Sequence, residues 1–82
     1  MELSYFVYIL KNTFINWHYV GFTRDIELRL LQHNKSLVKS TRFYKPFELI
    51  FVQIVKNSTE ARRLEKFFKV RFNKEALLNI LT

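Results

Sequence analysis

Residues 4–22 read SYFVYILKNTFINWHYVGF and contain two apolar runs separated by a turn. The runs Ser4–Leu10 and Trp17–Phe22 are rich in aromatic and β-branched residues, which predicts two strands. A polar turn is expected to begin at Lys11 and to close at Asn16, so that the strands form an antiparallel hairpin. Because both faces of these strands are apolar, we expect the sheet to be covered on both sides or to be centrally placed.

Gly21 is the only glycine of the chain. Inside a strand, glycine often marks a point where another backbone or a ligand comes close. The second strand is therefore expected to carry one position of close approach.

A helix is expected directly after the hairpin. Thr23 or Asp25 is suited to cap it, and its pattern ends near Asn34. Arg29 and His33 are four residues apart, so they are expected to project side by side from this helix. Residues 35–45 show no helix period and predict a polar, basic loop.

The second half of the chain predicts a third strand and two more helices. Pro46 precedes a strand over Phe47–Ile54, where its missing N–H is tolerated. Asn57 and Glu60 have capping-box spacing for a helix over about residues 58–72. The inward stripe of this helix is expected to hold Ala61, Leu64, Phe68 and Phe72. A short last helix is expected over residues 74–81, with Ala76, Leu77, Ile80 and Leu81 inward. The order β-β-α-β-α-α predicts a single α+β domain over residues 1–82.

Composition limits the classes of function. The chain has no cysteine, which excludes disulfides and Cys-based zinc sites. Its apolar runs are too short to cross a bilayer and no signal peptide is visible, so a cytoplasmic location and no membrane partner are expected. The formal net charge of +7 arises beyond residue 22. Such a basic surface predicts nucleic acid as the partner, with general solubility as the alternative.

Four positions carry residue types suited to phosphodiester hydrolysis: Tyr8, Tyr19, Arg29 and Glu65. Either tyrosine can take a proton from water if a cation or metal lowers the phenol pKa from about 10. Arg29 can fork onto phosphate oxygens. Glu65 can hold a divalent metal, since Mg²⁺ typically uses only one or two protein carboxylates. His33 can hydrogen-bond the phosphate or orient the attacking water.

Each of these residues also has a purely structural interpretation. A tyrosine in an apolar strand usually belongs to the core. Arg29 is spaced to pair with Asp25, and Glu65 is spaced to pair with Lys69. A single histidine such as His33 is mostly structural or solvated. Only the joint pattern favours catalysis.

The joint pattern resembles the GIY-YIG nuclease family, in particular small single-domain members similar to the N-terminal domain of the excision nuclease. Phe6-Val7-Tyr8 stands at the Gly-Ile-Tyr element, and Tyr19-Val20-Gly21 stands at the Tyr-Ile-Gly element. The stretch from Gly21 to Asn34 is similar to the helix that carries the family's arginine. Residues 40–49 resemble the loop and strand of the small members, and residues 60–66 resemble the helix with the metal-binding glutamate. The similarity spans about residues 5–70.

This resemblance implies a central three-stranded antiparallel sheet flanked by helices, and a metal-dependent nuclease. It implies that Tyr8 and Tyr19 are paired tyrosines, either of which serves as or assists the general base. Arg29 then contacts the scissile phosphate, and Glu65 binds a single Mg²⁺ or Mn²⁺. His33 matches a frequent accessory position. The implied products are a 5′-phosphate and a 3′-hydroxyl.

Three departures from the family pattern bear on substrate details. Phe6 replaces the first glycine, Leu64 stands where small members often have a basic residue, and the loop Thr13–Asn16 lacks the glycine often found there. None of them removes a residue implied to be catalytic.

The combined expectation is an endonuclease that acts on structured or branched DNA, with RNA as an alternative substrate, in DNA repair or recombination. A monomer or weak homodimer is expected. The other hypothesis is a nucleic-acid-binding module without catalysis, for which Phe43 and Tyr44 are suited to stack on unpaired bases. The residues expected to contact the phosphate backbone are Arg24, Lys35, Lys39, Arg42, Lys45, Arg62 and Lys69.

Overall fold

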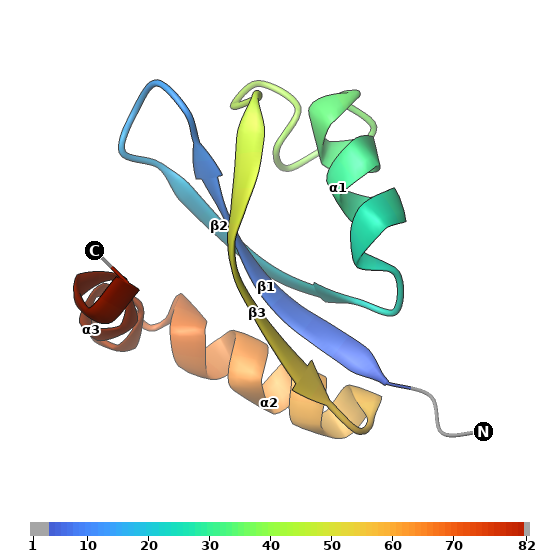
Figure 1. Cartoon of the computed structure of the whole chain (residues 1–82), viewed down its shortest axis with the longest axis vertical. Helices are drawn as coiled ribbons and strands as arrows, with labels where there is room; N and C mark the ends of the chain where they lie inside the picture. Colours follow the sequence, from blue (N-terminus) through green and yellow to red (C-terminus); the bar gives the residue numbers. More distant parts are fainter. Residues whose placement is uncertain (1–3, 82) are drawn as a thin grey trace.

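The computed structural model describes residues 4–81, without the side chain of Phe72. Strands β1 (Tyr5–Asn12), β2 (His18–Thr23) and β3 (Phe47–Val55) form one antiparallel sheet in the order β2-β1-β3. The helices are α1 (Ile26–Asn34), α2 (Ser58–Lys69) and α3 (Arg71–Leu81) (Figure 1). The predicted α+β order β-β-α-β-α-α is confirmed.

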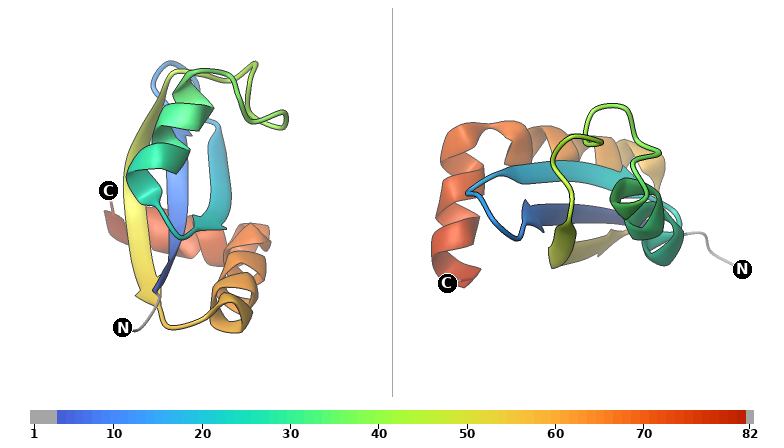
Figure 2. Two further views of the ribbon diagram at one scale, coloured as in Figure 1. Left: turned by 90° about the vertical axis from the view of Figure 1, so that its right-hand side faces the viewer. Right: turned by 90° about the horizontal axis from the view of Figure 1, so that it is seen from above.

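Helices cover both faces of the sheet, as the two views of Figure 2 show. Successive side chains of β1 alternate between the faces. Val7 and Ile9 pack with residues of α2 in one buried cluster, here called the α2-side cluster. Tyr8 and Leu10 pack with residues of α1 in a second cluster, the α1-side cluster. The predicted cover on both sides is therefore correct, and β1 supplies the centre of both clusters.

A bulge in β3 strengthens the α2-side cluster. Ile9 pairs with Phe51 and Leu10 pairs with Leu49, so Ile50 is the extra residue between them. Ile50 and Phe51 both pack against the α2-side cluster. The bulge thus lets two consecutive side chains of one strand reach the same face.

Local capping sets the starts of α1 and α2. Asp25 Oδ1 accepts a hydrogen bond from Leu28 N at 3.0 Å, and Asn57 Oδ1 accepts one from Glu60 N at 2.8 Å. Each side chain thereby satisfies an amide of the first helical turn. Of the two caps that the sequence left open for α1, the structure uses Asp25.

The boundary between α2 and α3 differs from the prediction. α2 ends at Lys69, Val70 has an extended backbone (φ −71°, ψ 120°), and α3 already begins at Arg71. The turn at Val70 sends α3 across the end of the sheet at a steep angle to α2 (Figure 1). The predicted inward position of Phe72 lies outside the described side chains.

The inward face predicted for α3 is largely wrong. Leu77 is half-buried and packs against the α2-side cluster. Ala76 and Leu81 are exposed, and Ile80 is 81% exposed. Among the described side chains of α3, the half-buried ones are at positions 73, 74, 77 and 78, so the inward face is rotated away from Ala76, Ile80 and Leu81. No helix within residues 4–81 combines the length and the apolarity that a membrane span requires.

Candidate active site

The two predicted tyrosines converge over Gly21. Tyr8 on β1 is the cross-strand partner of Gly21 on β2. A Cβ at Gly21 would lie 2.7 Å from Tyr8 Oη and 2.8 Å from Tyr19 Cε2, well inside van der Waals contact. The close approach expected at this glycine is therefore made by two side chains rather than by another backbone. It places the two phenol rings with their centroids 6.3 Å apart.

A buried chain of hydrogen bonds leads from Tyr8 into the loop after α1. Tyr8 Oη lies 2.9 Å from His33 Nε2, and His33 Nδ1 lies 2.7 Å from Thr41 Oγ1. The Thr41 hydroxyl donates to the Val38 carbonyl at 3.4 Å. Tyr8 is 2% exposed, and His33 and Thr41 are fully buried. Both ring nitrogens of His33 are thus engaged inside the protein.

Arg29 lies one turn before His33 on α1. Its Nη1 donates to Gln32 Oε1 at 3.3 Å, and its guanidinium acts on the Tyr8 phenol, whose pKa it lowers. The carboxylate of Asp25, the alternative partner considered from the sequence, caps α1. The half-buried guanidinium is therefore held beside the phenol of Tyr8.

Burial sets the protonation states of Tyr8 and His33 in this chain of hydrogen bonds. Burial raises the pKa of Tyr8 to about 12, and the nearby Arg29 guanidinium opposes this rise without overcoming it. Burial lowers the pKa of His33 to about 4, and the charge of Arg29 lowers it further. At pH 7, Tyr8 therefore carries its proton, while His33 is neutral and has one ring nitrogen able to accept a hydrogen bond.

Glu65 approaches from α2, which covers the other face of the sheet. Its side chain is 17% exposed, and its carboxylate lies 3.6 Å from Lys69 Nζ, so the predicted structural pair with Lys69 is present. The negative charge of Glu65 also acts on Tyr8, where it makes the smallest of the contributions that raise the pKa. The Glu65 carboxylate and the tyrosine pair therefore belong to one electrostatic environment.

Glu65 is also the predicted metal ligand. Within residues 4–81, no three His, Cys, Asp or Glu side chains are grouped to hold a metal ion. A single, mostly buried carboxylate nevertheless fits Mg²⁺ or Mn²⁺, because such an ion completes its shell with water and phosphate oxygens. The donor set is compatible with one weakly held ion rather than with an all-protein cage.

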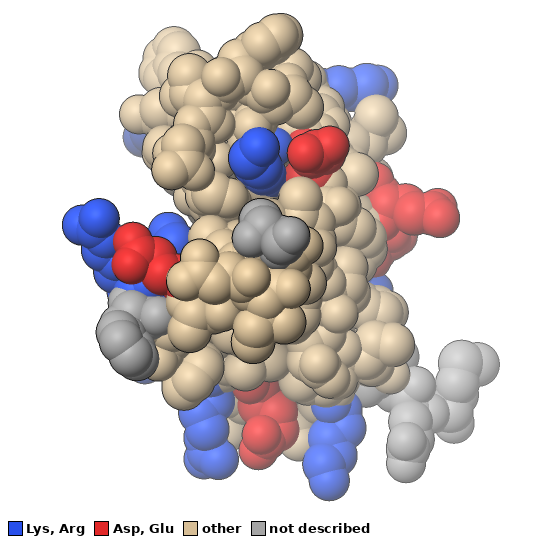
Figure 3. Space-filling view, turned by 60° about the vertical axis from the view of Figure 1, so that its left-hand side comes forward, with Lys and Arg blue, Asp and Glu red and all other residues tan. Residues whose placement is uncertain are grey.

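The seven predicted backbone-contact residues are all exposed. Arg24 lies between β2 and α1, with its guanidinium 5.3 Å from the centre of the Tyr5 ring. Four of the others lie on the loop after α1, and two lie on α2. These are Lys35, Lys39, Arg42 and Lys45 on the loop, and Arg62 and Lys69 on the helix. On the face seen in Figure 3, the basic side chains are scattered and several lie beside acidic ones, so this face offers no continuous basic surface.

An aromatic platform extends from the tyrosine pair to the surface. The ring of Trp17 stacks on Tyr44 with centroids 4.2 Å apart and an interplanar angle of 4°, and it also contacts Tyr19. Next to Tyr44, Phe43 is 80% exposed and lies 4.8 Å below the Arg42 guanidinium. The platform therefore offers flat apolar surface close to the tyrosines.

Three polar residues that build the site were not singled out from the sequence. Asn34 accepts from Phe47 N at 2.8 Å and donates to its carbonyl at 3.3 Å, which joins the end of α1 to β3. Asn12 donates to the Tyr44 carbonyl and holds the loop against the hairpin. Thr41 binds His33. Thr41 lies in the loop that resembles the family, and its sequence position gives no signal of burial.

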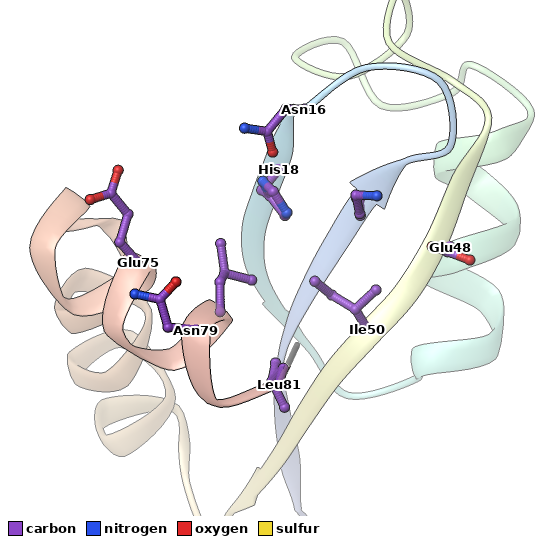
Figure 4. Close-up of a pocket in the computed structure, with 9 residues that line it drawn as sticks. Asn16, His18, Glu48, Ile50, Glu75, Asn79 and Leu81 are labelled. Atoms are coloured by element: carbon purple, nitrogen blue, oxygen red, sulfur yellow. The ribbon is translucent and has the colours of Figure 1, made fainter.

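A cavity of about 690 Å³ lies on the opposite face of the sheet from the tyrosine pair, between α3 and the hairpin (Figure 4). His18 and Glu48 approach it from the strands, and Glu75 and Leu81 approach it from α3. Burial lowers the pKa of His18, with Lys74 and Lys11 adding to this effect. The cavity is therefore separate from the predicted site.

Comparisons with known proteins match nearly the whole chain. Residues 4–79 match the family model described as the GIY-YIG catalytic domain. The chain is 33% identical over 78 residues to the UPF0213 protein YazA of Bacillus subtilis (strain 168), a match that covers 94% of this chain and 78% of that protein. It is also similar to the solution NMR structure of the UPF0213 protein BH0048 from Bacillus halodurans. That likeness has 31% identity and a TM-score of 0.58 and covers 94% of this chain and 84% of that chain.

Proposed function

Because this chain belongs to the GIY-YIG family of nucleases, we propose that it is a divalent-metal-dependent endonuclease that hydrolyses phosphodiesters of structured or branched DNA. The observation that carries the proposal is the convergence of Tyr8 and Tyr19 over Gly21, with the charge of Arg29 acting on Tyr8. The charge of Glu65 acts on the same phenol. A pure binding module has no need of this arrangement.

In the proposed reaction, the oxygen of water bonds to phosphorus while the bond from phosphorus to the 3′ oxygen breaks. These two changes leave a 5′-phosphate and a 3′-hydroxyl. The water proton passes to a tyrosine, and the departing oxygen takes a proton from solvent. Tyr8 is the favoured acceptor, because the neutral His33 behind it can take up its phenol proton.

Arg29 supplies the positive charge on the protein side. Its guanidinium is anchored by Gln32 and lies beside Tyr8, so its remaining N–H groups can fork onto the phosphate oxygens. Glu65 would hold the divalent ion, which when bound polarises the phosphate and stabilises the departing oxygen. Lys69 balances the Glu65 carboxylate in the free protein.

The preference for structured DNA rests on the aromatic platform and on the basic loop. Exposed Phe43 and the Trp17–Tyr44 stack are suited to unpaired bases, each worth about 1–3 kcal/mol of stacking. The lysines and arginines of the same loop contact phosphates, which fix position without reading sequence. Branched and flapped substrates contain both features, whereas plain duplex lacks exposed base faces.

A cleavage panel tests the proposal. Duplex, nicked, flap, junction and single-stranded DNA, and RNA, are incubated with and without Mg²⁺ or Mn²⁺. We expect metal-dependent cleavage of the substrates with unpaired segments, and its loss in Glu65→Ala with DNA affinity roughly retained. Glu60→Ala is the matched control, because Glu60 lies on the same helix and pairs with Arg63. Undiminished cleavage by Glu65→Ala would contradict the metal role, and inactivity of the wild type on every substrate would favour the binding module.

A second variant tests the role of Arg29. Arg29→Lys keeps the charge but loses the planar fork, and we expect the single-turnover rate to fall by about 10²-fold or more. The fall should come with little change in DNA affinity measured by fluorescence anisotropy. A loss of affinity with an unchanged rate would instead make Arg29 a positioning contact.

A further inference from the structure

The buried chain from Arg29 to Val38 has a direction that follows from its end groups. Arginine has donors and no acceptor, so the Arg29 guanidinium that acts on Tyr8 cannot accept the phenol proton. A backbone carbonyl accepts only, so the Thr41 hydroxyl proton points to Val38. Arg29 therefore cannot take the Tyr8 proton at one end, and the Thr41 proton is directed away from His33 at the other.

These two ends determine the tautomer of His33 between them. Because Arg29 cannot accept its proton, Tyr8 O–H donates to His33 Nε2 at 2.9 Å, and this nitrogen must then lack a proton. Because the Thr41 hydroxyl proton is directed to the Val38 carbonyl, Thr41 Oγ1 accepts from His33 Nδ1–H at 2.7 Å. The reverse direction would leave the Tyr8 proton without an acceptor among the described residues, at a cost of about 1–3 kcal/mol for a buried donor.

We propose that Thr41 is a positioning residue that holds His33 in the Nδ1–H tautomer, so that Nε2 is the acceptor for the Tyr8 phenol proton. Its catalytic consequence rests on the proposed function. When Tyr8 takes a proton from the attacking water, its own proton moves to His33 Nε2. Water thereby loses one proton, and Tyr8 gains one proton and gives one away. His33 becomes an imidazolium ion, and its Nδ1–H remains hydrogen-bonded to Thr41 Oγ1.

The surroundings of His33 suit this role. Burial and the nearby Arg29 keep His33 neutral before substrate binds, so its Nε2 lone pair is available at pH 7. The negative charge of a bound phosphate offsets the charge of Arg29 and favours the imidazolium at the moment it forms. Thr41 lies between Lys39 and Arg42, so the contact also joins the basic loop to the proton acceptor.

The tautomer is measured directly by ¹⁵N NMR of the imidazole nitrogens, without any need for activity. The chain has two histidines, and His18→Gln assigns the signals of His33. We expect the wild type to show a protonated Nδ1 and an unprotonated Nε2. Thr41→Val keeps the shape but removes the hydroxyl and should shift His33 toward the Nε2–H form, whereas Thr41→Ser should keep the wild-type pattern.

Kinetics then test the catalytic consequence. Thr41→Val should lower the single-turnover rate by about 10²-fold with KM nearly unchanged, and Thr41→Ser should restore it to within about threefold. If the wild type shows the Nε2–H tautomer, or if folded Thr41→Val keeps the wild-type pattern, the proposal is overturned. Equal rates for Thr41→Val and wild type would overturn its catalytic part.

The two hypotheses fail in different ways. If the wild type cleaves no substrate but shows the expected tautomer and its dependence on Thr41, the proposed function is wrong and the positioning contact stands. If Thr41→Val does not fold, as judged by circular dichroism, the tautomer of the wild type and of Thr41→Ser still decides. An Nε2–H form in either protein contradicts the proposal.

Discussion

At Gly21, a single methyl group would occupy space that Tyr8 and Tyr19 share. The added Cβ would lie 2.7–2.8 Å from both side chains, so one ring must move. Overpacking of this kind costs about 1–3 kcal/mol. We therefore expect Gly21→Ala to lower the free energy of unfolding in urea by that amount and to lower the cleavage rate as well. Unchanged stability would show that the tyrosines do not need the open space.

His33 links the site to the pH dependence of stability. Its pKa is about 4 in the folded chain, against an ordinary value of 6.5, so the unfolded chain binds the proton more readily between these values. Stability is therefore full above about pH 6.5 and falls as the pH drops toward 4. We expect a lower Tm at pH 5 than at pH 7.5, measured by circular dichroism.

The variant His33→Gln should remove most of that slope, whatever its effect on the Tm at pH 7.5. The pKa of His18 is lowered in the same direction, so His18→Gln serves as the comparison and should remove less. A pH slope in His33→Gln equal to that of the wild type would contradict the buried neutral state of His33.

Among the elements, α2 carries its basic residues unevenly around its axis. Successive helical residues are about 100° apart. Lys69, four residues after Glu65, and Arg62, three residues before it, therefore lie on the flank where Glu65 emerges. Arg63 lies on the other side and pairs with Glu60 at 3.6 Å. A phosphate backbone that approaches Glu65 should meet the first two residues and miss the third.

This asymmetry predicts a difference in salt dependence. Arg62→Gln and Lys69→Gln should each lower the slope of log affinity against log salt by about one, while Arg63→Gln should leave it unchanged. The measurement is fluorescence anisotropy with flap DNA in the absence of divalent metal, over a series of salt concentrations. An equal effect of Arg63→Gln would mean that the DNA contacts basic residues all over the exposed face of α2, and not only those on the side of Glu65.

The elements themselves were predictable where local chemistry decides them. Asp25 and Asn57 cap their helices through bonds to residues three positions ahead, and this information is contained in the sequence. The inward face of α3 was not predictable from its apolar pattern. Ile80 has the spacing of a core residue but is 81% exposed, because the turn at Val70 decides which side of α3 meets the sheet.

The same division holds for the whole molecule and its site. Tyr8, Tyr19, Arg29 and Glu65 could be proposed as site residues from the sequence because their types and spacing form a joint pattern. The contact from His33 to Thr41 was not, since it depends on how the aperiodic loop folds back over α1. The Trp17–Tyr44 stack joins two segments 27 positions apart and likewise needs the three-dimensional fold.

The two clusters share β1, which predicts that the molecule unfolds as one unit. Ile9 belongs to the α2-side cluster, whereas Trp17, the only tryptophan, packs against the α1-side cluster. Ile9→Val should cost about 0.5–1.5 kcal/mol and lower the Tm by a few degrees. Because β1 joins both clusters, the transition seen by Trp17 fluorescence should move together with the transition seen by far-UV circular dichroism. Exposed Ile80→Val is the matched control and should move neither. A fluorescence transition that stays in place while the dichroism transition shifts would show that the face with the tyrosine pair folds independently of the face with α2.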